Sequence, residues 1–131
     1  MTIAPPLPTL DNTLQQKWQR FIQTHLWKMD IHPTTWIAPT ALIDRTWPKG
    51  IHIAANCVID HHAVVLTHDM TRGIYLDTHI GENTRIGARA IIMPGVTVGK
   101  YCVVEPGSVV TRDIPDGIRV IGNPAKDIST L

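Results

Sequence analysis

The chain has 131 residues, of which 44% are hydrophobic and 5% aromatic, and its formal net charge is +1. This length and composition favour one domain with an aliphatic core. The net charge close to zero gives no electrostatic case for nucleic acid or an anionic membrane surface as a partner. No stretch approaches the roughly 20 apolar residues of a membrane span, and no signal-peptide pattern begins the chain. We therefore expect a cytoplasmic protein with no membrane span.

The N-terminal part predicts an extended arm followed by one amphipathic helix. Residues 1–10 contain three prolines, which disfavour regular structure. From Asp11 to Lys28 apolar residues return at helical spacing, with Asp11 available as the N-cap and Pro33 beyond the end. We expect residues 1–36 to form this arm and a helix that covers the first coil of the domain at 37–131. The apolar residues of the helix are Leu14, Trp18, Phe21, Ile22 and Leu26.

A six-residue period organises the rest of the chain. It fits neither an α-helix nor an amphipathic strand and predicts an internal repeat, an all-β solenoid in which stacked hexads share one core. We count the aliphatic residue of each hexad as position one. Small or β-branched residues then occupy position five, and Cys57 and Cys102 lie there, so we predict small buried thiols and no disulfide framework. The clearest aliphatic residues at position one are Ile80, Ile86, Ile92, Val98, Val104 and Val110.

The period begins at Ile37 and breaks twice. The first break, around residues 47–50, reads as a small loop, and the second separates Val65 from Ile80 by one hexad plus about nine extra residues. Inserted loops carry function more often than solenoid walls do. The second insertion, at about 66–79, is therefore the predicted functional loop, and it contains His68 and Asp69.

The hexads, the Thr67-His68 pair and three motifs resemble the hexapeptide-repeat acyltransferase superfamily, in particular its maltose, galactoside and colanic-acid or capsule acetyltransferase branch. The likeness covers roughly residues 37–126. It implies a left-handed parallel β-helix and a homotrimer that binds acetyl-CoA between neighbouring subunits. The motifs are IMPGVTVG at 92–99, GSVVTRD at 107–113 and GNPAK at 122–126.

The resemblance implies an acetyl-CoA-dependent O-acetyltransferase acting on a sugar or saccharide, plausible in polysaccharide biosynthesis. Acetyl transfer to a hydroxyl needs a base, and a histidine suits this task at neutral pH. His68 is the predicted general base, and Asp69 either orients its imidazole or faces solvent. The backbone N–H of Ala88 is the implied oxyanion donor. The residues implied to bind the cofactor are Ala88, Gly107, Ser108, Thr111, Arg112 and Lys126.

Two departures keep other functions open. Pro106 stands where the family often offers an N–H to the pantetheine arm, and Arg85 stands where a tryptophan is common. The alternatives are a non-catalytic β-helix subunit and a γ-carbonic-anhydrase-like zinc enzyme drawing on His62 and His68, although no metal is expected because the ligand spacing is absent. The acceptor, and whether O- or N-acetylation occurs, stay open. Surface or packing roles are expected for the other histidines, His25, His32, His52, His61, His62 and His79.

Overall fold

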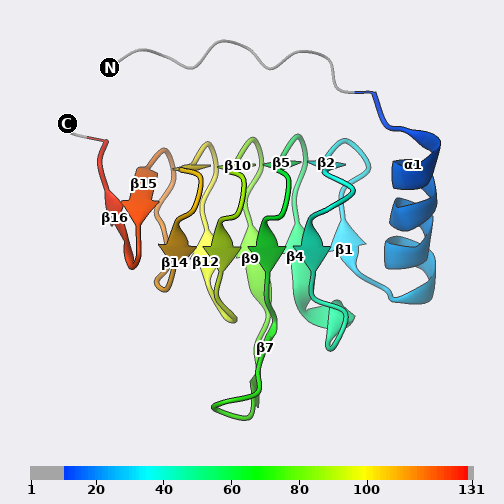
Figure 1. Cartoon of the computed structure of the whole chain (residues 1–131), viewed down its shortest axis with the longest axis horizontal. Coiled ribbons are helices and arrows are strands. Elements are labelled where there is room, and N and C mark those ends of the chain that lie inside the picture. Colours follow the sequence, from blue (N-terminus) through cyan, green and yellow to red (C-terminus); the bar gives the residue numbers. More distant parts are fainter. Residues whose placement is uncertain (1–10, 130–131) are drawn as a thin grey trace.

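The computed structural model describes residues 11–129 as a parallel β-solenoid with three faces and a helix at one end (Figure 1). Sheet A contains β1 (Asp30–Ile31), β4 (Ile51–Ile53), β9 (Thr78–Ile80) and β12 (Thr97–Val98). Sheet B contains β2 (Trp36–Ile37), β5 (Val58–Ile59), β10 (Arg85–Ile86), β13 (Val103–Val104), β15 (Arg119–Gly122) and β16 (Ala125–Asp127). Sheet C contains β3 (Leu42–Ile43), β6 (Val64–Val65), β11 (Ile91–Ile92) and β14 (Val109–Val110). The chain visits A, B and C in turn, so each coil adds one strand to each face. The proline-rich segment at 1–10 lies outside the described residues.

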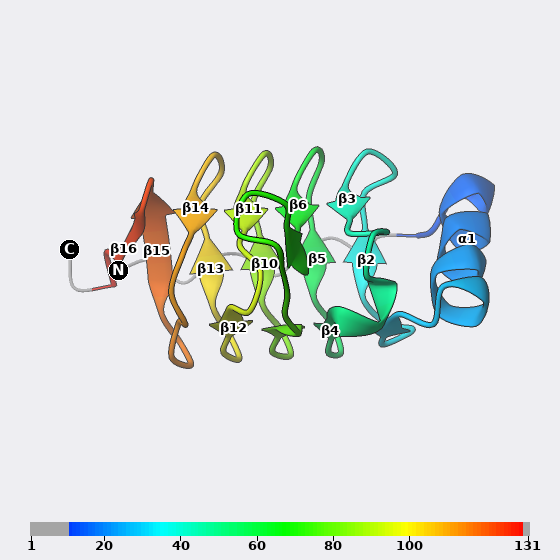
Figure 2. The ribbon, with the colours of Figure 1, turned by 90° about the horizontal axis from the view of Figure 1, so that it is seen from below.

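The aliphatic residue of each hexad points inward, as predicted. Ile53 pairs in register with Ile80, and Ile86 pairs with Val104, so the same hexad position stacks on itself from coil to coil. Figure 2 shows the strands lined up in rows along the solenoid. Ile31 continues this stack one hexad before Ile37, so the solenoid begins earlier than the sequence pattern indicated.

Position five is also buried, which explains why only small or β-branched residues occur there. Cys57 and Cys102 are 1% and 0% exposed and carry free thiols, and burial raises the pKa of the Cys57 thiol. Thr84 uses its buried hydroxyl to donate to the Gly99 carbonyl of the next coil at 2.7 Å. The small position-five side chains therefore fill the corners of the coils without forcing the strands apart.

Two backbone requirements shape the corners. Position four adopts a left-handed conformation in coil after coil, with positive φ at Asn83, Arg89 and Gly107 among others. Position two holds glycine where coils approach most closely: a Cβ on Gly87 would lie 2.6 Å from the Pro106 nitrogen. The crowding at these glycines comes from the neighbouring coil.

The helix differs from its sequence-based prediction. Helix α1 (Leu14–Phe21) begins at an N-cap on Thr13, which forms a capping box with Gln16, and continues as the π-helical turn η1 (Ile22–Leu26). Asp11 is therefore not the cap. The apolar face is not buried either: Leu14 is 84% exposed and Trp18 is 63% exposed, whereas Gln16 is 6% exposed.

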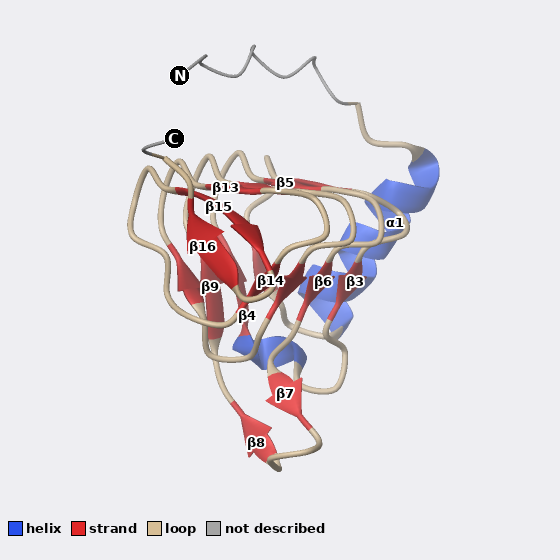
Figure 3. Cartoon of the chain, turned by 60° about the vertical axis from the view of Figure 1, so that its left-hand side comes forward, coloured by secondary structure: helices blue, strands red, loops and turns tan. Residues whose placement is uncertain are grey.

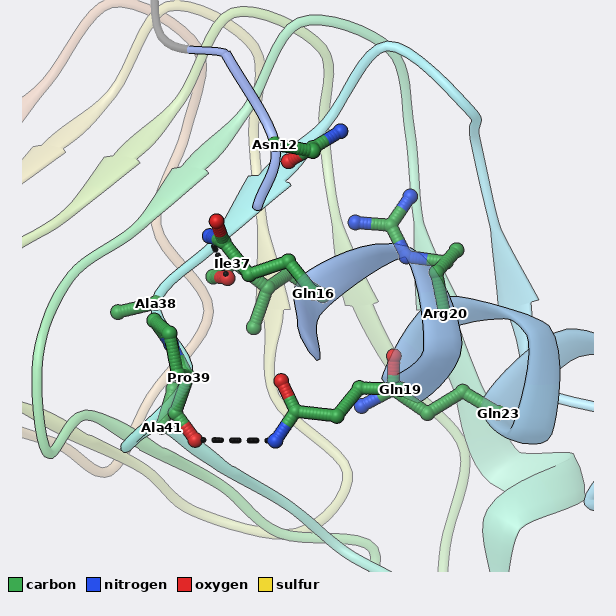
Figure 4. Close-up of a pocket in the computed structure, with 9 residues that line it drawn as sticks. All are labelled: Asn12, Gln16, Gln19, Arg20, Gln23, Ile37, Ala38, Pro39 and Ala41. Carbon is green, nitrogen blue, oxygen red and sulfur yellow. Dashed lines mark hydrogen bonds between the residues drawn. The ribbon is translucent and has the colours of Figure 1, made fainter. Parts of the chain in front are cut away.

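Hydrogen bonding explains this orientation. Each coil hydrogen-bonds to the next, as from Ala38 N to Ile59 O at 2.8 Å, but β2 and β3 are edge strands on the side of the helix, so their outward carbonyls have no strand to pair with. Polar side chains of the helix satisfy them: Gln16 Nε2 donates to Ile37 O at 2.9 Å, and Gln19 Nε2 donates to Pro39 O at 3.2 Å (Figure 4). Arg20 donates to the carbonyls of His32 and Thr35 at 3.1 and 2.6 Å. The helix covers the first coil, but by hydrogen bonding rather than apolar packing.

The other end is closed by a hairpin. Strand β15 turns back into the antiparallel strand β16. The N–H of Arg119 donates to Ser129 Oγ at 2.8 Å, and its carbonyl accepts from Ile128 N at 2.8 Å. No helix among residues 11–129 is long and apolar enough to cross a membrane.

Candidate functional site

The insertion after β6 forms a hairpin that projects from the solenoid (Figure 3). Its strands are β7 (His68–Asp69) and β8 (Ile74–Tyr75), paired antiparallel with His68 opposite Tyr75. The wall resumes at β9, where Thr78 is already paired with Ile51. The predicted functional loop therefore presents His68 at the edge of the solenoid between sheets C and A.

Asp69 stabilises the turn of this hairpin. Its Oδ1 accepts from the N–H groups of Thr71 and Arg72 at 2.9 and 3.2 Å, and its Oδ2 accepts from Arg72 Nε at 2.7 Å. The hydrogen bonds from the Arg72 side chain and backbone lower the pKa of the Asp69 carboxyl. Asp69 was expected either to orient the imidazole of His68 or to face solvent; its hydrogen bonds go to Thr71 and Arg72 of the turn and not to the imidazole.

The residue that contacts the imidazole is Asp44, which the sequence analysis did not single out. Asp44 follows β3 and is 2% exposed. Its Oδ2 lies against His68 Nδ1 and also accepts from the N–H groups of Thr67 and His68 at 2.9 and 3.1 Å, while Oδ1 accepts from Thr46 N at 2.9 Å. The carboxylate thus fixes both the ring and the backbone that carries it.

Burial alone would raise the pKa of the Asp44 carboxyl, but the hydrogen bonds from Thr67, His68 and Thr46 outweigh it and lower that pKa. Asp44 is therefore ionised at neutral pH, and its carboxylate accepts a hydrogen bond from the protonated Nδ1 of His68. In this tautomer Nε2 of His68 is the nitrogen that can accept a proton. An acid–base pair of this kind suits removal of a proton from an attacking hydroxyl.

Residues at the first break in the hexad period, 47–50, pack against the same hairpin. Thr67 Oγ1 donates to the Trp47 carbonyl at 2.8 Å, and the Trp47 ring meets Tyr75 edge to face at 6.1 Å between centroids. Gly50, in the 3₁₀ turn η2 (Pro48–Gly50), leaves room for that ring, because a Cβ there would lie 2.6 Å from it. Tyr75 is 55% exposed, and its ring centroid is 6.4 Å from that of His68.

The predicted oxyanion donor lies on a different edge from His68. Ala88 lies in the turn from sheet B to sheet C, where its carbonyl accepts from Gly107 N at 2.8 Å. His68 lies after sheet C. Within one chain, sheet C therefore separates Ala88 from His68.

The predicted cofactor residues are also spread over the surface of one chain. Thr111 and Arg112 are exposed after β14, on the same edge as His68, and Lys126 is exposed on β16. Ser108 is fully buried, and its hydroxyl accepts from Gly122 N, so its side chain belongs to the coil. Any cofactor contact at Ser108 would have to come from its backbone.

Residues 77–112 match the family described as bacterial transferase hexapeptide (six repeats). A Bacillus subtilis (strain 168) protein named "Putative acetyltransferase YvoF" is 33% identical over 105 residues, which are 79% of this chain and 61% of that protein. A Staphylococcus aureus (strain COL) protein named "Putative acetyltransferase SACOL2570" is 50% identical over 53 residues, which are 40% of this chain and 27% of that protein. The chain thus spans less than two thirds of the length of either relative.

Solved structures agree with the fold. A maltose O-acetyltransferase from Clostridium difficile 630 matches 92% of this chain and 77% of its own, with a TM-score of 0.58 and 25% identity. The hexapeptide-repeat acetyltransferase VCA0836 from Vibrio cholerae matches 88% of this chain and 81% of its own, with a TM-score of 0.64 and 23% identity. The predicted resemblance to hexapeptide-repeat acyltransferases is confirmed. These names give no support to the zinc-enzyme alternative.

Proposed function

We propose that the protein is an acetyl-CoA-dependent O-acetyltransferase that acts on a hydroxyl of a sugar or saccharide, with His68 as general base. The observation that carries this proposal is the contact between His68, on the hairpin that projects from the hexapeptide solenoid, and the buried, ionised Asp44 of the preceding coil. The acetyltransferase names of the relatives and of the maltose O-acetyltransferase support the reaction class. Polysaccharide biosynthesis in the cytoplasm is the setting that we expect for such an acceptor.

In the proposed reaction Nε2 of His68 removes the proton of the acceptor hydroxyl as its oxygen attacks the thioester carbonyl of acetyl-CoA. The tetrahedral oxyanion needs a fixed donor, and the N–H of Ala88 has no hydrogen-bond partner among residues 11–129. Collapse of the intermediate releases the coenzyme A thiolate, which takes up the proton from His68. The products are an acetyl ester and free coenzyme A.

A complete site requires a second subunit in this proposal. His68 and Ala88 lie on opposite edges of sheet C in one chain, so a neighbouring copy must bring one edge against the other. A left-handed β-helix assembled as a homotrimer, as the family resemblance implies, is the arrangement that we propose. A sedimentation measurement showing a monomer at micromolar concentration would contradict this shared site.

The test is an assay of thiol release from acetyl-CoA against a panel of sugars, with mass spectrometry of the acceptor. We expect an ester mass increment on a sugar for the parent protein and a roughly 10²–10⁴-fold lower turnover for His68→Ala. His25→Ala, at an exposed helix position, is the matched control and should keep the parent rate. A folded His68→Ala protein that retains the parent rate would refute the assignment, and a parent protein inactive with all acceptors would favour the non-catalytic reading.

A further inference from the structure

A second cluster of reactive side chains lies on the outer face of sheet A, apart from His68 and Asp44. Asp30, His52 and His79 occupy the same register position on β1, β4 and β9, with Asp30 paired to His52 and His52 paired to His79. Asp77 immediately precedes β9, at the end of the insertion. Three successive coils and the returning hairpin thus bring two imidazoles and two carboxylates together.

His52 is at the centre of this cluster. Its Nδ1 lies 3.0 Å from Asp30 Oδ2, and its Nε2 lies 3.1 Å from Asp77 Oδ2. The His79 ring stacks on the His52 ring, with centroids 4.5 Å apart and planes 10° from parallel. His52, Asp77 and His79 each place one ligand atom within 4.8 Å of the others.

We propose that His52, Asp77 and His79 bind one divalent transition-metal ion of the Zn²⁺, Ni²⁺ or Co²⁺ type. Imidazole and carboxylate together are ligands that these ions accept readily. Metal-binding histidines commonly donate the other ring N–H to a carboxylate, which fixes the tautomer and the ring orientation. Asp30 occupies that supporting position at Nδ1 and leaves Nε2 as the nitrogen that faces the metal.

The distances between these ligand atoms fit a tetrahedral metal ion after one side chain, His79, moves. Ligands on a tetrahedral ion with bonds of about 2.0–2.1 Å lie about 3.4 Å apart, close to the 3.1 Å between His52 Nε2 and Asp77 Oδ2. The three ligand atoms lie within 4.8 Å of one another, so the ring nitrogen of His79 must move closer to the other two by up to about 1.5 Å. Because the His79 side chain is exposed, it can turn toward the ion without disturbing the core.

The bound ion would connect the insertion to the wall of the solenoid. Asp77 follows the hairpin strand β8 by two residues, whereas His52 belongs to the preceding coil. A metal held by both ties the returning end of the hairpin to sheet A. We therefore expect binding to raise the melting temperature, because the ion is held by the folded state alone.

The experiment is a titration of the untagged, chelator-treated full chain with Co²⁺, followed by calorimetry and by the visible absorption of the ion. The parent protein should bind one Co²⁺ per chain with micromolar affinity, and its melting temperature should rise on saturation. His79→Gln should weaken binding at least 10-fold, and His52→Gln should do the same. Because His79 is exposed, its variant keeps the test valid even if His52→Gln does not fold.

Two controls separate this cluster from other histidines. His61→Gln, at an exposed corner, and His68→Ala, which removes the imidazole of the other cluster, should both bind Co²⁺ as the parent does. Absence of Co²⁺ binding by the parent protein, or unchanged binding by a folded His79→Gln protein, would overturn the proposal. Loss of binding in His68→Ala alone would move the site to the Asp44–His68 pair and would also refute it.

Discussion

The carboxylate of Asp44 contacts the imidazole of His68 although 24 residues separate them in the chain. The contact forms because Asp44 directly follows β3 of sheet C, one coil before β6, after which the insertion begins. Asp44 N donates to Val65 O at 2.9 Å, which sets the two corners directly on top of each other. The stacking of coils, rather than the insertion itself, thus supplies the partner of His68.

This relationship predicts the effect of Asp44→Asn. An amide at position 44 can donate to Nδ1, which would place the imidazole proton on Nε2 and remove the base from the acceptor side. We expect kcat to fall at least about 10-fold, but less than the roughly 10²–10⁴-fold loss for His68→Ala. Asp69→Asn is the control, because Asp69 contacts Thr71 and Arg72 instead; an equal loss there would contradict the role assigned to Asp44.

Asp44 also predicts a component of acid sensitivity. Its folded-state pKa is lowered, so its contribution to stability is present above the unfolded-state value of about 3.9 and is lost as pH falls through the folded-state value. The free energy of unfolding of Asp44→Asn should therefore depend less steeply on pH below about pH 4 than that of the parent. Urea unfolding between neutral pH and pH 3 measures this difference, and parallel curves would disprove it.

The cap at the first coil predicts a contrast between two adjacent glutamines. Gln16→Ala removes the donor to Ile37 O and leaves a buried carbonyl unpaired, which should cost about 1–3 kcal/mol in the free energy of unfolding. Gln15→Ala, at an exposed position of the same helix, should change it by less than about 0.5 kcal/mol. Urea titrations of both variants test this, and equal effects would show that the helix does not cap the coil through Gln16.

Two glycines predict different costs for the same added methyl group. Gly87→Ala places a Cβ against the backbone of the next coil and should reach the upper part of the about 1–3 kcal/mol range for overpacking. Gly107→Ala meets nothing within 4 Å, and its cost should be about 1 kcal/mol, from its left-handed φ of 75° alone. Thermal and urea unfolding rank the two, and the reverse order would mean that coil spacing is not fixed by Gly87.

The proposed cofactor contacts predict a kinetic signature. Replacing Arg112 and Lys126 together with Ala should raise the KM for acetyl-CoA more than it lowers kcat, because phosphate contacts remote from the thioester are similar in the ground and transition states. Lys17→Ala, on an exposed position of α1, is the charge-matched control. A fall in kcat with unchanged KM would show that these two residues do not bind coenzyme A.

The sequence predicted the core of the fold because each hexad repeats the same two requirements. Position one must be aliphatic and position five small, and Ile86 and Cys102 meet them at 1% and 0% exposure. The helix face could not be predicted in this way. Apolar periodicity indicates which residues share a face, but here the unpaired carbonyls of the first coil required donors, and Gln16 was drawn inward while Leu14 stayed exposed.

His68 was predicted because it lies in the inserted loop, but its partner was not. Asp44 looks like an ordinary corner residue of a hexad, and only the alignment of coils shows that it lies beneath the insertion. A signal was present, since Asp44 lies three residues before the first break in the period, at residues 47–50. That break holds Trp47 against Tyr75, so the two interruptions form one structure.

The helix that covers the first coil has a consequence for the order of synthesis. Strands β2 and β3 are the edge strands on the side of the helix, and Gln16, Gln19 and Arg20 donate to carbonyls of that coil. The helix leaves the ribosome before the first coil, so it can cover this edge as soon as that coil forms. Growth then proceeds from the C-terminal edge alone, where each new coil pairs with the last. A nascent chain with the helix in place therefore exposes one strand edge instead of two, which removes the second surface through which two half-made solenoids would join end to end.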